Sequence, residues 1–294
     1  MANAHAPSPD SHHYYVPHGS PWPIIAAFSL FGLMVGAILY LDGAAGAWAL
    51  LIGPVLLAFM FTGWFSTVIG ENQHGVYNAQ VDRSFRMGMM WFIFSEVMFF
   101  AAFFGALFYA RMFAIPWLGG QGTKALTNYL LWPHFESTWP TNGPGQVGGA
   151  KFEVMNPLGI PAINTLILLS SAVTVTIAHH ALRAGNRTRL KIFLAITFIL
   201  GFTFVALQAH EYGEAYLHMN LRLTTGIYGT TFFMLTGFHG LHVTIGAIML
   251  LVIWIRVMRG HFTPDKHFAF EAVAWYWHFV DVVWLGLYIF VYWL

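Results

Sequence analysis

Seven long apolar runs, separated by segments that carry most of the charges, constrain this chain more than any other feature of its sequence. A helix needs about 20 predominantly apolar residues to cross the hydrocarbon core of a bilayer, and each run has about that length or more. Only helices and closed barrels satisfy their backbone polar groups inside a membrane. The chain is therefore expected to be an all-α membrane protein with seven transmembrane helices. The predicted spans are residues 24–41, 48–70, 87–110, 160–182, 192–210, 226–255 and 272–294.

The composition supports this class and excludes several functions. Of the residues, 57% are hydrophobic and 9% are charged, whereas a soluble domain carries about 25% charged residues. The net charge of +1, without any basic cluster, does not indicate nucleic-acid binding. The chain has no cysteine, which excludes disulfides, iron–sulfur clusters and thiolate-bound metals. Any metal bound by this chain would need histidine and carboxylate ligands.

Charges and linkers also suggest how the chain is organised. The first two spans are joined by only a few residues, so they are expected to form an antiparallel hairpin. Gly32 and Gly36 have the spacing that lets helices approach closely. Gly, Pro and Asn residues indicate an irregular structure for the one long outer loop, 112–159. The expected parts are an N-terminal tail at 1–22, two transmembrane helices at 23–75, and five transmembrane helices with the outer loop at 76–294.

The distribution of basic residues predicts the orientation in the membrane. Nine of the 13 Lys and Arg residues lie in loops on the side of the N-terminal tail, and four lie on the opposite side. The positive-inside rule places the N-terminus in the cytoplasm, or in the matrix of a mitochondrion, and the C-terminus outside. The tail contains histidines that can exchange protons near neutral pH. Whether they do so, or belong to a disordered polar tail, stays open for His5, His12, His13 and His18.

Besides His179 and His180 near a helix end, six acidic or histidine side chains lie inside the predicted spans: Glu96, His210, His239, His242, His278 and Asp281. A charged group at the centre of a membrane helix costs about 2.5–3.5 kcal/mol on insertion scales, so such groups usually face protein and have partners. Two pairs have the one-turn spacing that puts both side chains on one helix face. We therefore expect Glu96 and Asp281 to be buried carboxylates, and His239 with His242, and His278 with Asp281, to be structural polar pairs.

Three interpretations of these side chains compete. They can form a metal or haem site, because intramembrane histidines are good ligands. However, repeated histidine-rich boxes are missing, and the one extra pair, His179–His180, consists of neighbours that point in different directions on a helix. They can relay protons or bind a transported substrate, but the outer halves of the helices that hold Glu96 and Asp281 are apolar and aromatic. The third interpretation, which we favour, is that they fix helix packing or hold lipid headgroups and partner chains.

Short motifs in most of the spans show a resemblance to a known family. They are Ser20–Pro23, Ser95–Phe100, Ala178–Leu182, His210–Ala215, Gly237–Val243 and Phe270–Trp284. In these motifs, and in their order along nearly the whole chain, the sequence resembles cytochrome c oxidase subunit III of the aa3-type haem–copper oxidases. Seven helices are typical of the cytochrome c branch, since related quinol oxidase subunits commonly lack the first two. The long outer loop favours a bacterial member, in the inner (plasma) membrane, with a periplasmic C-terminus.

The resemblance implies a non-catalytic subunit of an oxygen-reducing, proton-pumping complex of the aerobic respiratory chain. Haem a, haem a3 and copper would then lie in partner subunits, with subunit I the main contact and subunit II another. The first two helices and the other five would enclose a cleft that holds phospholipids. The subunit would support proton uptake and protect the active site during turnover. The alternatives are an independent membrane metalloprotein with His and carboxylate ligands, or a proton-coupled transporter.

The resemblance also assigns individual residues. Glu96 falls on the family's buried, carbodiimide-reactive carboxylate. Burial favours its neutral acid form, which can donate a hydrogen bond, and His242 is the expected acceptor. Where many members have paired histidines after the second helix, this chain has Gly75–Tyr77, so Tyr77 is the expected replacement. The positions that would contact lipid are Trp64, Glu71, Tyr77, Glu96, His242, Arg256 and His261. No metal ligand is assigned, and Asp281 is expected to need a further donor from another helix or from subunit I.

Overall fold

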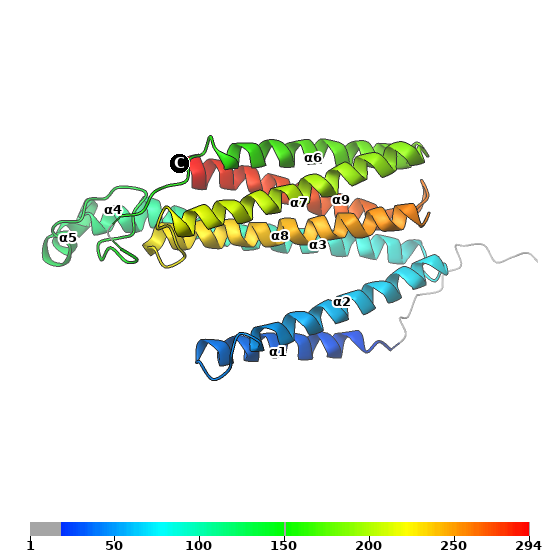
Figure 1. Cartoon of the computed structure of the whole chain (residues 1–294), viewed down its shortest axis with the longest axis horizontal. Helices are drawn as coiled ribbons and strands as arrows, with labels where there is room; N and C mark the ends of the chain where they lie inside the picture. The colour runs from blue at the N-terminus through cyan, green and yellow to red at the C-terminus, as the bar shows by residue number, and fades with distance from the viewer. Residues whose placement is uncertain (1–18, 150, 294) are drawn as a thin grey trace, which may run out of the picture. The chain divides into compact units, whose positions relative to one another are not determined.

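The computed structural model describes residues 19–149 and 151–293, and these residues form helices, turns and irregular segments without any strand. Seven of the helices among them are long and apolar enough to cross a membrane, so the predicted fold class is confirmed. The tail histidines His5, His12, His13 and His18 lie outside the described residues. The long helices are α1 (Trp22–Leu41), α2 (Ala49–Gln73), α3 (Ala79–Tyr109), α6 (Ile160–Arg183), α7 (Arg187–Leu217), α8 (Gly226–Met258) and α9 (Phe268–Leu287) (Figure 1).

Several helices extend past the charges that were expected to end them. α7 begins five residues before its predicted span, because Arg187, Arg189 and Lys191 lie on its first turns rather than in a loop. Asn186 caps this start, since its side-chain oxygen accepts a hydrogen bond from the Arg189 backbone N–H at 3.1 Å. Long basic side chains can keep their charge in water while their stems lie along an apolar helix. The charges therefore do not mark the helix ends.

The chain divides into two compact units, Met1–Met87 and Gly88–Leu294. In the first unit, α1 and α2 form the expected hairpin. Two glycines allow this close contact: a Cβ atom on Gly36 would lie 2.2 Å from the Ala49 carbonyl oxygen, and one on Gly53 would lie 2.3 Å from the Leu33 Cα. Gly32 stands at ordinary packing distance from α2, so Gly36 is the member of the Gly-x-x-x-Gly pair that brings the backbones together.

In the second unit, α6, α7, α8 and α9 lie side by side around a core rich in aromatic side chains (Figure 1). Trp277 and Trp284 of α9 are the largest fully buried side chains, and each indole N–H finds a hydroxyl on α6. Trp277 Nε1 donates to Ser171 Oγ, and Trp284 Nε1 donates to Thr165 Oγ1, both at 2.9 Å. Spaced two turns apart, these bonds fix the register between α6 and α9.

The segment expected to be an irregular loop begins with more helix. α3 continues through a π-helical turn at Ala110–Ala114 into α4 (Ile115–Leu118), because the apolar sequence runs on past Arg111. A short 3₁₀ turn (Gly122–Lys124) and α5 (Ala125–Leu131) follow. The Asn128 amide then donates to the carbonyl groups of Leu118, Trp132 and Phe135, which ties α5 to the segments on both sides. The rest of 112–159 is largely turn and irregular structure in the part that the structure describes.

Candidate functional site

The clearest polar contact between membrane helices joins Glu96 of α3 to His242 of α8. His242 Nε2 lies 2.7 Å from Glu96 Oε2, which confirms the expected contact between these two residues. The other ring nitrogen, Nδ1, lies 2.6 Å from the Phe238 carbonyl oxygen. Aromatic rings surround the imidazole, with the Phe100 ring centroid at 5.0 Å and the Tyr276 centroid at 6.3 Å. The side chains of His242 and Glu96 are 11% and 22% exposed, so the pair is less buried than expected.

The hydrogen-bond geometry determines how many protons Glu96 and His242 hold together. A carbonyl oxygen can only accept, so Nδ1 carries a hydrogen and donates it to Phe238. One more proton must then lie between Nε2 and the carboxyl group. The pair is therefore either a neutral acid that donates to a neutral imidazole or a carboxylate that accepts from an imidazolium. Both forms have no net charge, which lowers the cost of placing the pair inside a membrane.

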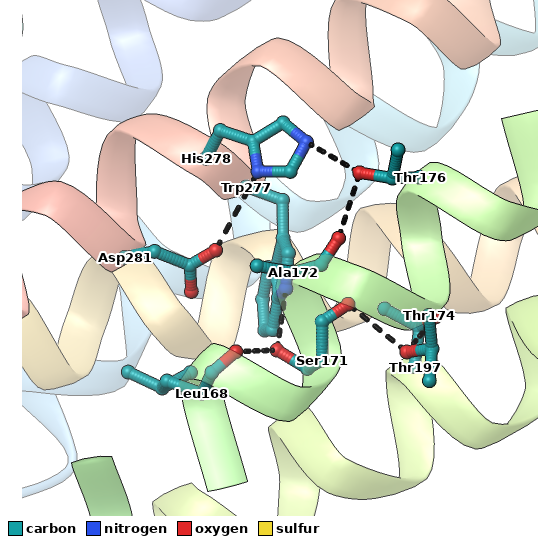
Figure 2. Close-up of polar contacts among 9 residues, drawn as sticks. All are labelled: Leu168, Ser171, Ala172, Thr174, Thr176, Thr197, Trp277, His278 and Asp281. Carbon is teal, nitrogen blue, oxygen red and sulfur yellow. Dashed lines mark hydrogen bonds and ion pairs between the residues drawn. The ribbon is translucent and has the colours of Figure 1, made fainter. Parts of the chain in front are cut away.

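His278 and Asp281 form a second pair, on α9, shown in Figure 2. His278 Nδ1 lies 3.7 Å from Asp281 Oδ2, and His278 Nε2 lies 3.4 Å from Thr176 Oγ1 of α6. The Thr176 hydroxyl donates to the Ala172 carbonyl oxygen at 2.8 Å, so His278 Nε2 must be the donor to Thr176. Nδ1 then faces Asp281 without a hydrogen unless the pair holds one more proton. One added proton, on Nδ1 or on Asp281, would allow a hydrogen bond between these two side chains.

The two members of the second pair differ in burial. Asp281 is 6% exposed, as expected for a buried carboxylate, whereas His278 is 44% exposed and does not face the protein interior. Neither Asp281 oxygen accepts a hydrogen bond from any residue that the structure describes. The further donor expected from another helix is therefore not on Asp281; the link to α6 runs through His278 and Thr176. A donor from a partner subunit stays a prediction.

His239 and His242 share α8 but do not pair with each other. The His239 ring is buried among aromatic side chains, stacked on Trp284 at 5.2 Å and edge-on to Phe204 at 5.8 Å. Neither of its ring nitrogens has a hydrogen-bond partner among the described residues. His239, His242 and His278 do not join any group of three metal-ligating side chains in that part of the chain. The one such group consists of His179, His267 and Glu271.

The positions expected to contact lipid fall into separate groups. In the first unit, the Tyr77 hydroxyl donates to Glu71 Oε2 at 2.5 Å, and Trp64 lies exposed on α2. Tyr77 therefore does lie beside one of the expected lipid-contacting residues. Glu96 and His242 lie together in the second unit, as described.

Arg256 and His261 lie at the end of α8, in a cationic cluster. The Arg256 guanidinium lies 4.5 Å above the centroid of the Phe262 ring, and Arg187 of α7 donates to the Phe262 carbonyl oxygen at 2.6 Å. The His261 backbone N–H donates to the Arg256 carbonyl oxygen at 3.1 Å. Burial, together with the charges of Arg256 and Arg259, lowers the pKa of His261 below its usual value. The cluster is thus a site where an added negative charge would be stabilised.

One buried carboxylate was missed from the sequence. His210 lies within the candidate span of α7, as expected, and its side chain is exposed, whereas its neighbour Glu211 is fully buried. The Tyr292 hydroxyl, at the C-terminal end of the chain, donates to Glu211 Oε1 at 2.6 Å. Phe204, Gln208, Glu211 and Ala215 recur at helical spacing and are all buried. That spacing could have identified Glu211, but the predicted span ended at His210.

Sequence similarity to known proteins extends along nearly the whole chain. The family described as Cytochrome c oxidase subunit III matches residues 12–125 and 123–294. The chain is 40% identical over 284 residues to "Cytochrome c oxidase subunit 3" of Oryctolagus cuniculus, covering 96% of this chain and 97% of the relative. It is 41% identical over 283 residues to the protein of the same description from Papio hamadryas, with the same coverage. The corresponding protein of Coturnix japonica is 39% identical over 284 residues.

Proposed function

We propose a function that follows from one premise: this chain belongs to the cytochrome c oxidase subunit III family. It is a multi-pass membrane subunit of an oxidase complex. Within that complex, its role is non-catalytic: it stabilises subunit I, binds phospholipids and supports proton uptake during oxygen reduction. Haem a, haem a3 and copper reside in the partner subunits.

The observation that carries the non-catalytic role is the pairing of the ionisable side chains inside the spans. Glu96 bonds to His242, His278 lies between Asp281 and Thr176, and Tyr292 donates to Glu211. His239, His242 and His278 are thus engaged separately, by an aromatic cage, a carboxylate and a hydroxyl, and do not converge as a ligand set. Each pair also links two helices or two turns of one helix, which supports a packing role.

The cationic cluster at the end of α8 supports phospholipid binding. Arg256 and Arg187 are fixed by the ring and the carbonyl group of Phe262, and burial, together with the positive field of Arg256 and Arg259, lowers the pKa of His261. A phosphate headgroup would neutralise that field, and its acyl chains would lie along the apolar helices. The other expected lipid contacts, Trp64, Glu71, Tyr77, Glu96 and His242, and the lipid-holding cleft stay proposals that rest on the resemblance.

The orientation and location follow from the basic residues. α6, α7, α8 and α9 alternate in direction, so the end of α8 lies at the same end of the bundle as Arg183 and Arg187. We place this end on the inner side of a bacterial inner membrane, with the N-terminus in the cytoplasm and the C-terminus in the periplasm. Mitochondrial inner membrane, with the tail in the matrix, is the second candidate.

The test compares oxidase purified with the natural chain and with Arg256→Gln. Phosphorus analysis should show less tightly bound phospholipid per haem in the variant, with unchanged haem spectra. Lys191→Gln, a basic residue outside the cluster, serves as the control for a change of net charge alone. Equal phospholipid content in all three enzymes would contradict the lipid role of the cluster. Stoichiometric iron or copper bound by His239, His242 or His278 would contradict the non-catalytic role.

A further inference from the structure

Three ionisable side chains that the proposed function does not use meet where α6 ends and α9 begins. His179 lies on the last turns of α6, His267 directly precedes α9, and Glu271 lies on the first turn of α9. His267 Nε2 is 3.1 Å from Glu271 Oε1, and His179 Nε2 is 3.7 Å from the same oxygen. The ligand atoms of all three side chains lie within 4.8 Å of one another.

Ring packing positions the two imidazoles. The His179 ring stacks on Phe270 at 5.5 Å and lies 5.4 Å from the His267 ring. His267 is 9% exposed, and apart from the 3.1 Å contact between its Nε2 and Glu271 Oε1, neither of its ring nitrogens makes a hydrogen bond in the described part of the chain. His179 Nε2 makes no hydrogen bond there either. A buried ring nitrogen without a partner loses its hydration, and a ligand that binds it restores that lost interaction.

This arrangement has the chemistry of a site for a late first-row divalent cation. Imidazole nitrogen suits zinc, copper and nickel, and two imidazoles with one carboxylate form a known zinc ligand set. A tetrahedral zinc ion with ligands at about 2.0–2.2 Å would separate its ligand atoms by about 3.3 Å. The two measured separations, 3.1 and 3.7 Å, lie on either side of that value.

We propose that His179, His267 and Glu271 bind one divalent transition-metal ion, with Zn²⁺ as the reference ion. The ion would connect the end of α6 to the start of α9, two segments separated by about 90 residues of chain. Its fourth ligand would be water or an external anion, because the chain supplies three ligands. The site is distinct from the cationic cluster of Arg256 and His261 and does not depend on lipid binding.

The first experiment measures zinc bound to the assembled oxidase by equilibrium dialysis and elemental analysis. The natural enzyme is compared with His179→Gln, His267→Gln and Glu271→Gln, each of which removes one ligand and keeps a polar side chain. His180→Gln is the matched control, because His180 is the neighbouring histidine, is exposed, and belongs to no metal-ligating group in the described residues. Comparison with the natural enzyme subtracts any zinc bound by other subunits.

We expect the natural enzyme and the control to bind one more zinc ion than each of the three variants, or to bind it at least about tenfold more tightly. Equal zinc content and affinity in all five enzymes would overturn the proposal. Loss of zinc in the control as strongly as in the three variants would also overturn it.

A second measurement needs no variant and decides the matter if a substitution prevents assembly. Crystals of the natural oxidase soaked in Zn²⁺ are measured at the zinc absorption edge. An anomalous peak within bonding distance of His179 Nε2, His267 Nε2 and Glu271 is expected. Absence of that peak at a zinc concentration that saturates binding in dialysis would overturn the proposal.

Discussion

His242 uses both of its ring nitrogens, and this determines how Glu96 can be replaced. Nδ1 donates to the Phe238 carbonyl oxygen, so Nε2 is free to accept a hydrogen from a neutral partner. A glutamine amide at position 96 offers an N–H in place of the carboxyl proton. An alanine at position 96 has no hydrogen-bond donor, so the largely buried His242 Nε2 is left without a partner.

We therefore predict that Glu96→Gln assembles almost normally and pumps protons, whereas Glu96→Ala loses about 1–3 kcal/mol of stability. Thermal unfolding of the purified complex, followed through retention of this subunit, measures the difference. Proton pumping in reconstituted vesicles is measured beside it. A well-assembled Glu96→Gln enzyme that does not pump would show that the carboxyl group takes part in proton transfer and is not structural.

The lowered pKa of His261 gives a pH dependence with a definite sign. At a pH between the lowered and the ordinary value, the unfolded chain binds more protons at this residue than the folded chain. The His261 contribution therefore destabilises the fold progressively as the pH falls below the ordinary histidine value, and it is absent above that value. A bound phosphate group would raise this pKa again, so phosphate binding and protonation favour each other.

We predict that anionic phospholipid binds the complex more tightly as the pH falls from about 8 to about 6. Titration of delipidated oxidase with an anionic phospholipid at several pH values tests this. His261→Gln should bind with a flatter pH dependence, because the group that takes up the proton is gone. A pH dependence that is unchanged in His261→Gln would assign the effect to another residue.

Trp277 shows how the helices of the second unit depend on one another. Its indole N–H bonds to Ser171 of α6, while its ring lies against Gly201 of α7 and Gly246 of α8. A Cβ atom on Gly201 would lie 2.7 Å from the ring, and one on Gly246 would lie 2.8 Å from it. One side chain of α9 therefore contacts the other three helices, and small residues on two of them make room for it.

We predict that Gly246→Ala lowers the stability of the complex by about 1–3 kcal/mol, because a well-packed core cannot accept the added methyl group. Gly240→Ala on the same helix is the matched control, since no atom lies within 4 Å of its added Cβ. There the higher helix propensity of alanine should leave stability equal or slightly increased. Thermal unfolding in detergent compares the two, and equal stability would contradict the proposed role of Trp277.

Hydropathy identified the seven spans because each charge near a membrane surface interrupts an apolar run. It placed Glu96 and Asp281 inside the membrane, and the resemblance then pointed to the contact with His242. Hydropathy could not show which of the later helices are neighbours, because the order in which helices pack side by side leaves no repeating pattern in the sequence. Only the short linker between the first two spans identified a neighbouring pair. The contact between Glu211 and Tyr292, and the group of His179, His267 and Glu271, join distant runs and were missed for that reason. Glu271 also lies one residue before the last predicted span, 272–294.

We expect Asp281 to affect mainly how firmly this subunit stays attached to its partner subunits. Its Oδ2 lies 3.7 Å from His278 Nδ1, and neither of its oxygens accepts a hydrogen bond from a described residue. Asp281→Asn offers an amide N–H to His278 Nδ1, whereas Asp281→Ala removes the interaction. We predict that Asp281→Ala loses this subunit during detergent purification, with intact haem spectra in the remaining complex, and that Asp281→Asn retains it.

Subunit stoichiometry after purification, measured beside turnover per haem, tests this prediction. Retention of the subunit in Asp281→Ala with clearly reduced turnover would reject the packing role. It would favour a role for Asp281 in proton entry instead.

The proton shared by Glu96 and His242 has a consequence for the energised membrane. Moving one charge across the whole hydrocarbon core, about 30 Å, changes its energy by about 2.3 kcal/mol per 100 mV. The two atoms that share this proton are 2.7 Å apart. Even if their bond lay along the membrane normal, a proton moving between them would gain or lose only about 0.2 kcal/mol per 100 mV. The membrane voltage therefore has little influence on which partner holds the proton, and the contact between α3 and α8 persists whether or not the membrane is energised.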